Sequence, residues 1–206
     1  YANQAGIVIG NGASLLDVPL DFLNSLPSIG SNRIYLLENF TPTFYTVINA
    51  SVAQQFSTDI DTKLHGAIKF ITVKAKVLIE TADYWLNSEL KPDFSFTPDV
   101  FVNQGYTVTY VNLQIAFWLG FNPVYLVGVD HQYSYTGKPN ETRVAEGIDV
   151  NHFATNYFTG GVQWQNPDLL ASEKYYKIAK RIYDEHNRKI INLTTRTMLN
   201  VFEHGN

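Results

Sequence analysis

A glycine-rich turn near the N-terminus has residue types that suit the binding of a phosphate group. Gly10, Asn11, Gly12 and Ser14 directly follow the β-branched run at residues 7–9. Glycines let the backbone approach a ligand closely, and the N–H groups at the start of a following helix attract an anion. The spacing is neither a dinucleotide fingerprint nor a P-loop with its lysine. The residues alone therefore leave two interpretations open, a phosphate-binding loop and a tight strand-to-helix connection.

A second polar segment begins where the apolar run at residues 124–129 ends in Asp130. Ligands of open α/β sheets bind at the carboxyl ends of the strands, so Asp130 is a candidate to bind a ribose, a metal or a partner side chain. Tyr133 and Tyr135 follow closely, and their hydroxyls can donate to a leaving phosphate. An ordinary strand-ending Asp and surface tyrosines are the alternative interpretation.

His152 is the candidate general base. Histidine titrates near neutrality and often takes this role in enzymes. Among the five histidines His152 ranks first and His131 second, and a structural or solvated histidine is the alternative. Thr107 and Thr109 stand at the start of an apolar helical segment, where they are expected to cap the helix and could also present hydroxyls to a phosphate or ribose.

The elements that must position these residues alternate along the chain. We expect strands at residues 7–9, 33–37, 44–48, 67–78, 124–129 and 190–193, and helices at 15–26, 51–61, 108–119 and 167–187. Asn49 falls just past the strand at 44–48, residues 28–32 have turn chemistry, and 86–99 is predicted to be a loop. This order predicts an α/β fold of the Rossmann-like kind, with a mostly parallel sheet flanked by helices. A loop-rich lid is expected at about residues 131–165.

Composition excludes several function classes. Hydrophobic residues make up 45% of the 206 residues, so one domain with a full core is expected. A net charge of −4 argues against a nucleic-acid partner. Cysteine is absent, which excludes a disulfide, a thiolate zinc site and a cysteine nucleophile. No cluster of His, Asp and Glu has zinc-ligand spacing, and we predict no metal-ligating residues.

Location and extent are expectations of the same kind. No apolar run is long enough to cross a bilayer, and the first residues do not resemble a signal peptide. We therefore expect no transmembrane segment and a cytoplasmic location. Because the chain does not begin with Met, we expect it to be a piece of a longer protein.

Several segments, taken in order, resemble the MptE-like (DUF115) family. They are residues 9–15, 31–33, 105–109, 114–116, 119–121, 124–130, 152–153, 157–158 and 189–194. That family includes flagellin-glycosylating motility accessory proteins and a 6-hydroxymethylpterin diphosphokinase. More distantly, the pattern is similar to the small bacterial sialyltransferases that use CMP-sialic acid.

The resemblance implies roles for most of these candidates. The nucleotide would lie across the first turn, and the residues that would bind it are Gly10, Asn11, Gly12, Ser14, Asn32, Asn49, Thr107 and Thr109. Asp130 would be a site residue at a strand end. Tyr133 and Tyr135 would steady the leaving phosphate, and His152 would be the catalytic base.

The preferred hypothesis is a glycosyltransferase that uses a CMP-linked nonulosonic acid as donor and a glycan or protein as acceptor, with no obligatory cofactor. Its chemistry depends on positioning and charge stabilisation. The runner-up is pyrophosphoryl transfer from ATP to a hydroxymethylpterin-like substrate, which would require Mg²⁺ with Asp130 as a ligand. A non-catalytic nucleotide-binding module is the third interpretation, and the sequence leaves oligomerisation open.

Overall fold

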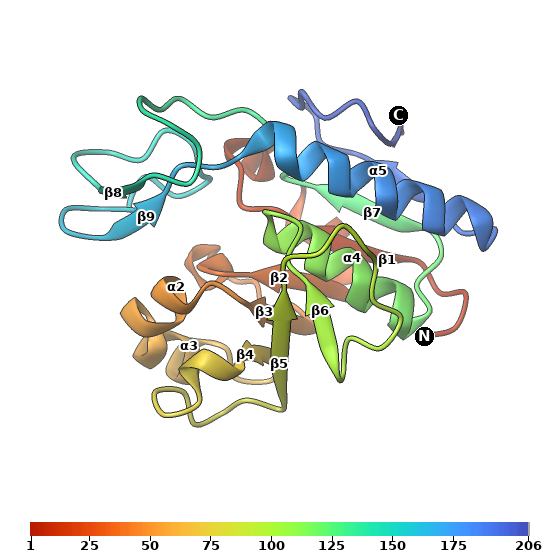
Figure 1. Cartoon of the computed structure of the whole chain (residues 1–206), viewed down its shortest axis with the longest axis horizontal. Coiled ribbons are helices and arrows are strands. Elements are labelled where there is room, and N and C mark those ends of the chain that lie inside the picture. Colours follow the sequence, from red (N-terminus) through yellow and green to blue (C-terminus); the bar gives the residue numbers. More distant parts are fainter. Residues whose placement is uncertain (206) are drawn as a thin grey trace.

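A computed structural model describes residues 1–205 and shows one large parallel sheet between two layers of helices (Figure 1). The nine strands lie in the order β11-β10-β7-β1-β2-β3-β4-β5-β6. Their bounds are β1 Gly6–Ile9, β2 Ser28–Ser31, β3 Phe44–Val47, β4 Ile68–Thr72, β5 Tyr84–Glu89, β6 Phe101–Asn103, β7 Val124–Val127, β10 Ile190–Asn192 and β11 Glu203–His204. All neighbouring pairs of this sheet are parallel, which confirms the predicted fold class.

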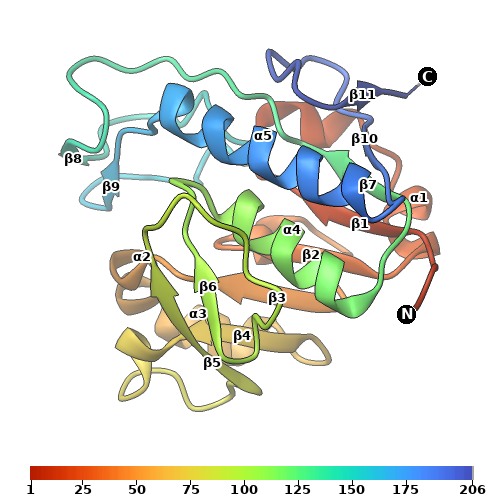
Figure 2. The same ribbon diagram turned by 45° about the vertical axis from the view of Figure 1, so that its right-hand side comes forward.

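Alternation along the strands divides the core into two halves. On β1, Val8 packs into the half that contains α4 and α5, whereas Ile7 and Ile9 pack into the other half with residues of α1, α2 and α3. The helices are α1 Leu20–Ser25, α2 Ala50–Gln55, α3 Ser57–Lys63, α4 Val108–Leu119 and α5 Leu169–Glu185. Figure 2 shows α4 and α5 side by side over one face of the sheet. Strands covered on both faces are expected to be apolar throughout, as β1 and β7 are.

The predicted buried helix and the predicted buried strand after it are confirmed as α4 and β7. Thr107 caps α4, because its side chain accepts a hydrogen bond from the backbone N–H of Thr109. Gly120 ends the helix in the left-handed conformation, with φ of 88°, which glycine adopts without strain. β7 then pairs with β1 on one side and β10 on the other.

Strand order reverses direction at β1, and this creates the expected ligand position. From β1 the chain builds β2, β3 and β4 outward on one side, and returns to add β7 on the other side. In open parallel sheets such a switch leaves a crevice at the carboxyl ends of the two adjacent strands. Here those ends are followed by the turn at residues 10–14 and by Asp130.

Three strand and loop predictions were wrong. Residues 28–31, which have turn chemistry, form β2, and residues 33–37 contain the short 3-10 helix η2 Ile34–Leu36 in place of a strand. Residues 86–89 of the predicted loop belong to β5. β2 reads Ser-Ile-Gly-Ser, so its extended form depends on pairing with β1 and β3 rather than on local propensity.

Two predicted helices and one predicted strand are divided. The segment 15–26 splits at Pro19 into the 3-10 helix η1 Ala13–Asp17 and α1, because proline cannot continue a helix from within. The segment 51–61 splits at Phe56, which ends α2 and begins α3. The strand expected at 67–78 ends at Thr72, which caps the 3-10 helix η3 Val73–Ala75.

Residues 131–165, here called the lid segment, extend beyond the carboxyl edge of the sheet (Figure 1). They contain a separate antiparallel hairpin of β8 Thr142–Val144 and β9 Gln163–Gln165. The side chain of Gln55 at the end of α2 holds this hairpin: its Oε1 accepts from the N–H of Gln163 at 2.8 Å, and its Nε2 donates to the carbonyl of Gln163 at 2.9 Å. Within residues 1–205, no helix is both long enough and apolar enough to span a membrane.

Candidate active site at the carboxyl edge of the sheet

The glycine-rich turn is braced by the segment that follows β7. The N–H of Gly12 donates to the carbonyl of Gly128 at 2.9 Å, and a Cβ on Gly10 would overlap that same carbonyl oxygen. Asp130 accepts hydrogen bonds from the backbone N–H of Ser14, at 3.1 Å, and from its hydroxyl. Ser14 and Asp130 are both buried, so their polar groups are directed at each other and fix the shape of the turn.

The lid segment returns to this turn at His152. The N–H of Phe153 donates to the carbonyl of Asn11 at 3.1 Å, and Gly12 forms an antiparallel bridge with His152. Residues more than a hundred positions apart therefore meet at the end of β1. This contact brings the predicted general base to the predicted nucleotide-binding turn.

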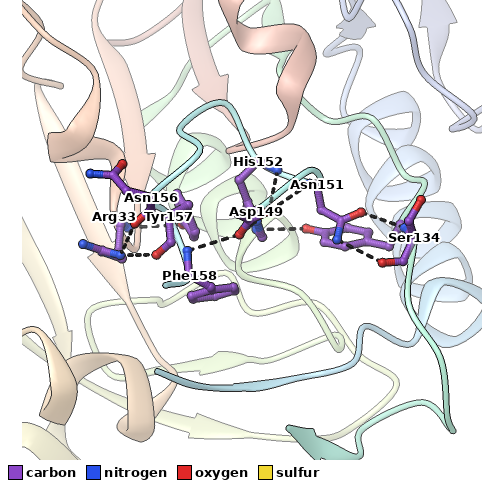
Figure 3. Close-up of polar contacts among 9 residues, drawn as sticks. Arg33, Ser134, Asp149, Asn151, His152, Asn156, Tyr157 and Phe158 are labelled. Carbon is purple, nitrogen blue, oxygen red and sulfur yellow. Dashed lines mark hydrogen bonds and ion pairs between the residues drawn. The ribbon is translucent and has the colours of Figure 1, made fainter. Parts of the chain in front are cut away.

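Asp149 orients the His152 ring. Its Oδ2 lies 2.9 Å from Nδ1 of His152, and its Oδ1 accepts from the N–H groups of Asn151 and His152 (Figure 3). The pKa of Asp149 is lowered, so its ionised carboxylate can only accept, which favours the neutral ring form with the proton on Nδ1 and the lone pair on Nε2. Burial alone would raise the pKa of the Asp149 carboxyl, but the His152 ring and the backbone N–H groups lower it below its usual value.

Aromatic rings also pack against His152. Tyr157 stacks on it in parallel, with ring centroids 4.0 Å apart, and Phe158 meets it edge to face at 5.0 Å. The hydroxyl of Tyr133 lies 3.5 Å from Nε2. Burial raises the pKa of Tyr133, so its hydroxyl keeps its proton and can donate. The ring that carries the lone pair therefore faces a protonated phenol.

Tyr135 and His131 lie apart from this group. The Tyr135 hydroxyl donates to the carbonyl of Pro167 at 3.1 Å, just before α5. His131 packs against α5, with Nε2 4.0 Å from Glu173, and burial lowers its pKa although Glu173 opposes this. The two predicted tyrosines are thus placed differently, and only Tyr133 contacts His152.

Arg33 fixes the backbone that carries the stacking ring. Its guanidinium donates to the carbonyls of Asn156, at 3.0 Å, and Tyr157 (Figure 3). The same group lies 4.1 Å above the ring centroid of Phe56, a cation–π contact. Arg33 is buried, so its charge is satisfied by these carbonyls and rings rather than offered to a ligand.

Two amide oxygens just past the ends of β1 and β2 lack a hydrogen-bond partner among residues 1–205. They are Oδ1 of Asn11, which follows β1, and Oδ1 of Asn32, which follows β2. The Asn11 amide nitrogen donates to the carbonyl of Ser31 at 3.2 Å, and this hydrogen bond fixes the direction in which Oδ1 of Asn11 points. Buried acceptors without partners are uncommon and costly, and an N–H or O–H group of a ligand would satisfy them.

The remaining predicted binding residues line the same edge as helix caps. Asn49 caps α2, accepting from the N–H of Ser51 at 2.9 Å, and its amide nitrogen lies 3.4 Å from Oε1 of Gln165 in the lid segment. Thr107 caps α4, with its hydroxyl 3.5 Å from that of Tyr176, and Thr109 is buried two residues further along, in the first turn of the helix. No hydrogen bond of the described chain joins these two threonines to His152.

Sequence reasoning missed Asp149, Tyr157 and Arg33 as parts of this arrangement. Asp149 stands three residues before His152, a spacing at which a loop can return a carboxylate to the ring. Arg33 and Tyr157 have no such local signal, because they meet only in the folded chain. Among residues 1–205 no group of three or more His, Asp or Glu side chains could hold a metal ion.

A hollow of about 520 Å³ opens in the lid segment next to the oriented histidine. Its walls come from residues 134–136, from β8, from residues 148–152 and from the rings of Phe158 and Trp164. Its volume is within the range typical of small-molecule sites.

The parallel sheet with polar groups gathered at one edge defines a Rossmann-like α/β protein. Solved structures of the sialyltransferase CstII from Campylobacter jejuni share this fold. Its complex with the substrate analogue cytidine-5′-monophosphate superimposes with a TM-score of 0.52 at 13% identity, over 99% of this chain and 85% of that chain. Its complex with the substrate analogue CMP-3FNeuAc gives 0.50 at 14% identity, over 98% of this chain and 86% of that chain. The chain therefore shares the Rossmann-like fold of these structures.

No protein-family model and no curated protein matches its sequence.

Proposed function

We propose that the chain is a glycosyltransferase that transfers a nonulosonic acid from a CMP-linked donor to a hydroxyl of a glycan or protein acceptor. The observation that carries the proposal is the His152 ring, oriented by Asp149 and joined to the glycine-rich turn at Gly12. The likeness in fold to sialyltransferase structures with bound CMP supports the choice of donor.

The residues divide the reaction between them. Nε2 of His152 accepts the proton of the acceptor hydroxyl while its oxygen bonds to the anomeric carbon of the donor sugar. The bond from that carbon to the phosphate oxygen breaks at the same time, and CMP leaves with the electron pair. Tyr133, protonated and 3.5 Å from Nε2, donates to the departing phosphate. Tyr135 is the alternative donor to that phosphate, although its hydroxyl here donates to the carbonyl of Pro167.

The donor is held at the carboxyl ends of β1 and β2. The turn at residues 10–14 approaches the phosphate and ribose, while the Asn11 and Asn32 oxygens accept hydrogen bonds from the donor's hydroxyl or amino groups. Asn49, Thr107 and Thr109 complete the edge at which the nucleotide lies. Asp130 acts through Ser14 by keeping the turn in shape.

The first test measures nucleotide binding by thermal shift with CMP, CDP, UDP, GDP and ATP, each with and without Mg²⁺. A ligand that binds only the folded chain raises the melting temperature by mass action. We expect CMP and CDP to stabilise without metal. Stabilisation by ATP alone, only with Mg²⁺, would overturn the proposal in favour of pyrophosphoryl transfer, and no response to any nucleotide would also overturn it.

The second test separates catalysis from binding. His152→Gln keeps a polar side chain but removes the lone pair that Asp149 orients, so CMP release from the donor should fall by about 10²-fold or more while CMP affinity persists. His65→Gln, at an exposed position just past the C-terminal end of α3, is the matched control. Full CMP binding without turnover in the unaltered chain would identify a binding module instead.

A further inference from the structure

Hydrogen bonds between its walls brace the hollow in the lid segment. Asn151 and Ser134 join two of its walls, since Oδ1 of Asn151 accepts from the N–H of Ser134 at 2.7 Å and its Nδ2 donates to the Ser134 carbonyl at 3.2 Å. Arg143 on β8 donates to the carbonyl of Thr136 at 2.9 Å and joins a third. A site with braced walls binds without the cost of ordering them.

One wall of the hollow is aromatic and leads to the general base. Trp164 and Phe158 stack with ring centroids 5.7 Å apart and an interplanar angle of 25°. Phe158 in turn meets the His152 ring, and His152 and Asp149 both line the hollow. Aromatic faces are apolar with a partial negative charge, and they attract the C–H groups on the face of a pyranose ring.

The charges of the hollow are predominantly negative. Glu141, Glu146 and Asp149 line it, and Arg143 is its one cationic lining residue, 3.9 Å from Glu141. Asp149 is engaged by His152, whereas Glu146 is exposed and has no ion pair within residues 1–205. A carboxylate or sulfate on a ligand would meet like charge in this space.

We propose that this hollow is the acceptor subsite and that it takes the pyranose ring of an uncharged glycan in preference to an anionic one. The inference rests on the proposed function, because an acceptor presupposes transfer from a donor bound at the glycine-rich turn. Stacking on Trp164 and Phe158 holds the ring so that a hydroxyl group reaches His152. Glu146 disfavours acceptors that already carry an acidic sugar.

The test compares methyl galactoside and methyl glucoside with their uronates, which differ by one carboxylate, using saturation-transfer NMR on the whole chain at low ionic strength. We expect the neutral glycosides to bind about tenfold more tightly, the size of one like-charge contact at a partly solvated site. Glu146→Gln, at an exposed position, should narrow this difference. Trp164→Ala should remove binding, and Trp118→Ala on α4 should not.

The glycoside-binding results decide whether the hollow is an acceptor subsite. The thermal-shift experiment with CMP tests the donor site separately. Equal or tighter binding of the uronates, no binding of any glycoside, or unchanged binding in Trp164→Ala would overturn the subsite. If CMP stabilises the chain while no glycoside binds, only the acceptor inference fails. If glycosides bind while CMP does not, the hollow is a sugar site and the proposed transferase function fails.

Discussion

The Asp149 carboxylate and the His152 ring form one hydrogen-bonded unit, with Oδ2 and Nδ1 2.9 Å apart and both side chains buried in the lid segment. The unit is anchored to the body of the protein where the lid segment meets the glycine-rich turn and where Arg33 holds the carbonyl groups beside Tyr157. Positioning of the general base therefore depends on residues far from it in sequence.

Replacing Asp149 by Asn should impair catalysis more than binding. The amide can still accept from the backbone but no longer selects the ring form with its lone pair on Nε2. We expect turnover of a CMP-linked donor to fall roughly 100-fold while CMP affinity stays within about twofold. Steady-state kinetics and calorimetry measure the two quantities. Equal losses of both would show that Asp149 supports the nucleotide site instead.

The same substitution should change the response of stability to acid. The pKa of Asp149 is lowered in the folded chain, so its stabilising contribution is complete above the unfolded pKa of about 4 and is lost as the pH falls through the folded value. At pH 7, Asp149→Asn should lower the free energy of unfolding by about 1–3 kcal/mol. By pH 3 its difference from the unaltered chain should be smaller.

Urea unfolding at several pH values provides the measurement. Asp99→Asn is the control, because Asp99 is exposed and its side chain makes no hydrogen bond or ion pair within the described residues. A difference between Asp149→Asn and the unaltered chain that stays constant from pH 7 to pH 3 would contradict the assignment.

Ser14 and Asp130 should behave as a coupled pair. Ser14→Ala leaves the buried Asp130 carboxylate with the backbone N–H of residue 14 as its remaining partner there, and should cost about 1–3 kcal/mol of stability. In a double-mutant cycle with Asp130→Asn, the two losses should be non-additive by about 1 kcal/mol or more. Additive losses would mean that the contact does not brace the turn.

Sequence reasoning succeeded where a signal is local. The apolar composition of the segments that form α4 and β7 predicts that they are buried, and the glycine after each segment marks its end. The sequence did not predict β2, because Ser28 and Gly30 favour turns. Only pairing with two neighbouring strands makes this segment extended. β6 and β11 are too short to produce a periodic pattern.

The candidate site divides in the same way. Gly10, Gly12 and His152 could be named from residue type and order, and the structure joins the turn to the histidine. Arg33 could not, because its function depends on carbonyl groups more than a hundred residues away. Asp130 was named for its place at a strand end, but only the folded chain shows that its carboxylate faces Ser14.

Gly10 should tolerate no side chain. A Cβ there would overlap the backbone carbonyl of Gly128, which cannot move without disturbing β7. Gly10→Ala should therefore destabilise the chain by about 1–3 kcal/mol, as overpacking of a rigid interior does. At Gly160 a Cβ meets nothing within 4 Å, and the φ angle suits alanine, so Gly160→Ala should leave the melting temperature nearly unchanged. Similar melting temperatures for the two variants would contradict the close contact of the turn with residue 128.

Gln55 should control how firmly the lid segment is attached. Its side-chain amide pairs with the backbone of Gln163 as a neighbouring strand would, accepting from the N–H at 2.8 Å and donating to the carbonyl at 2.9 Å. Gln55→Ala therefore removes both hydrogen bonds without altering the core. At about 1 kcal/mol for each bond, the hairpin should open at least tenfold more often. Hydrogen exchange of the β8–β9 amides measures this opening, and Gln54→Ala, the exposed neighbour on the same helix, is the control. Because the hairpin carries Trp164, faster exchange should come with weaker glycoside binding and unchanged CMP binding, whereas exchange rates equal to those of the control would show that other contacts hold the hairpin.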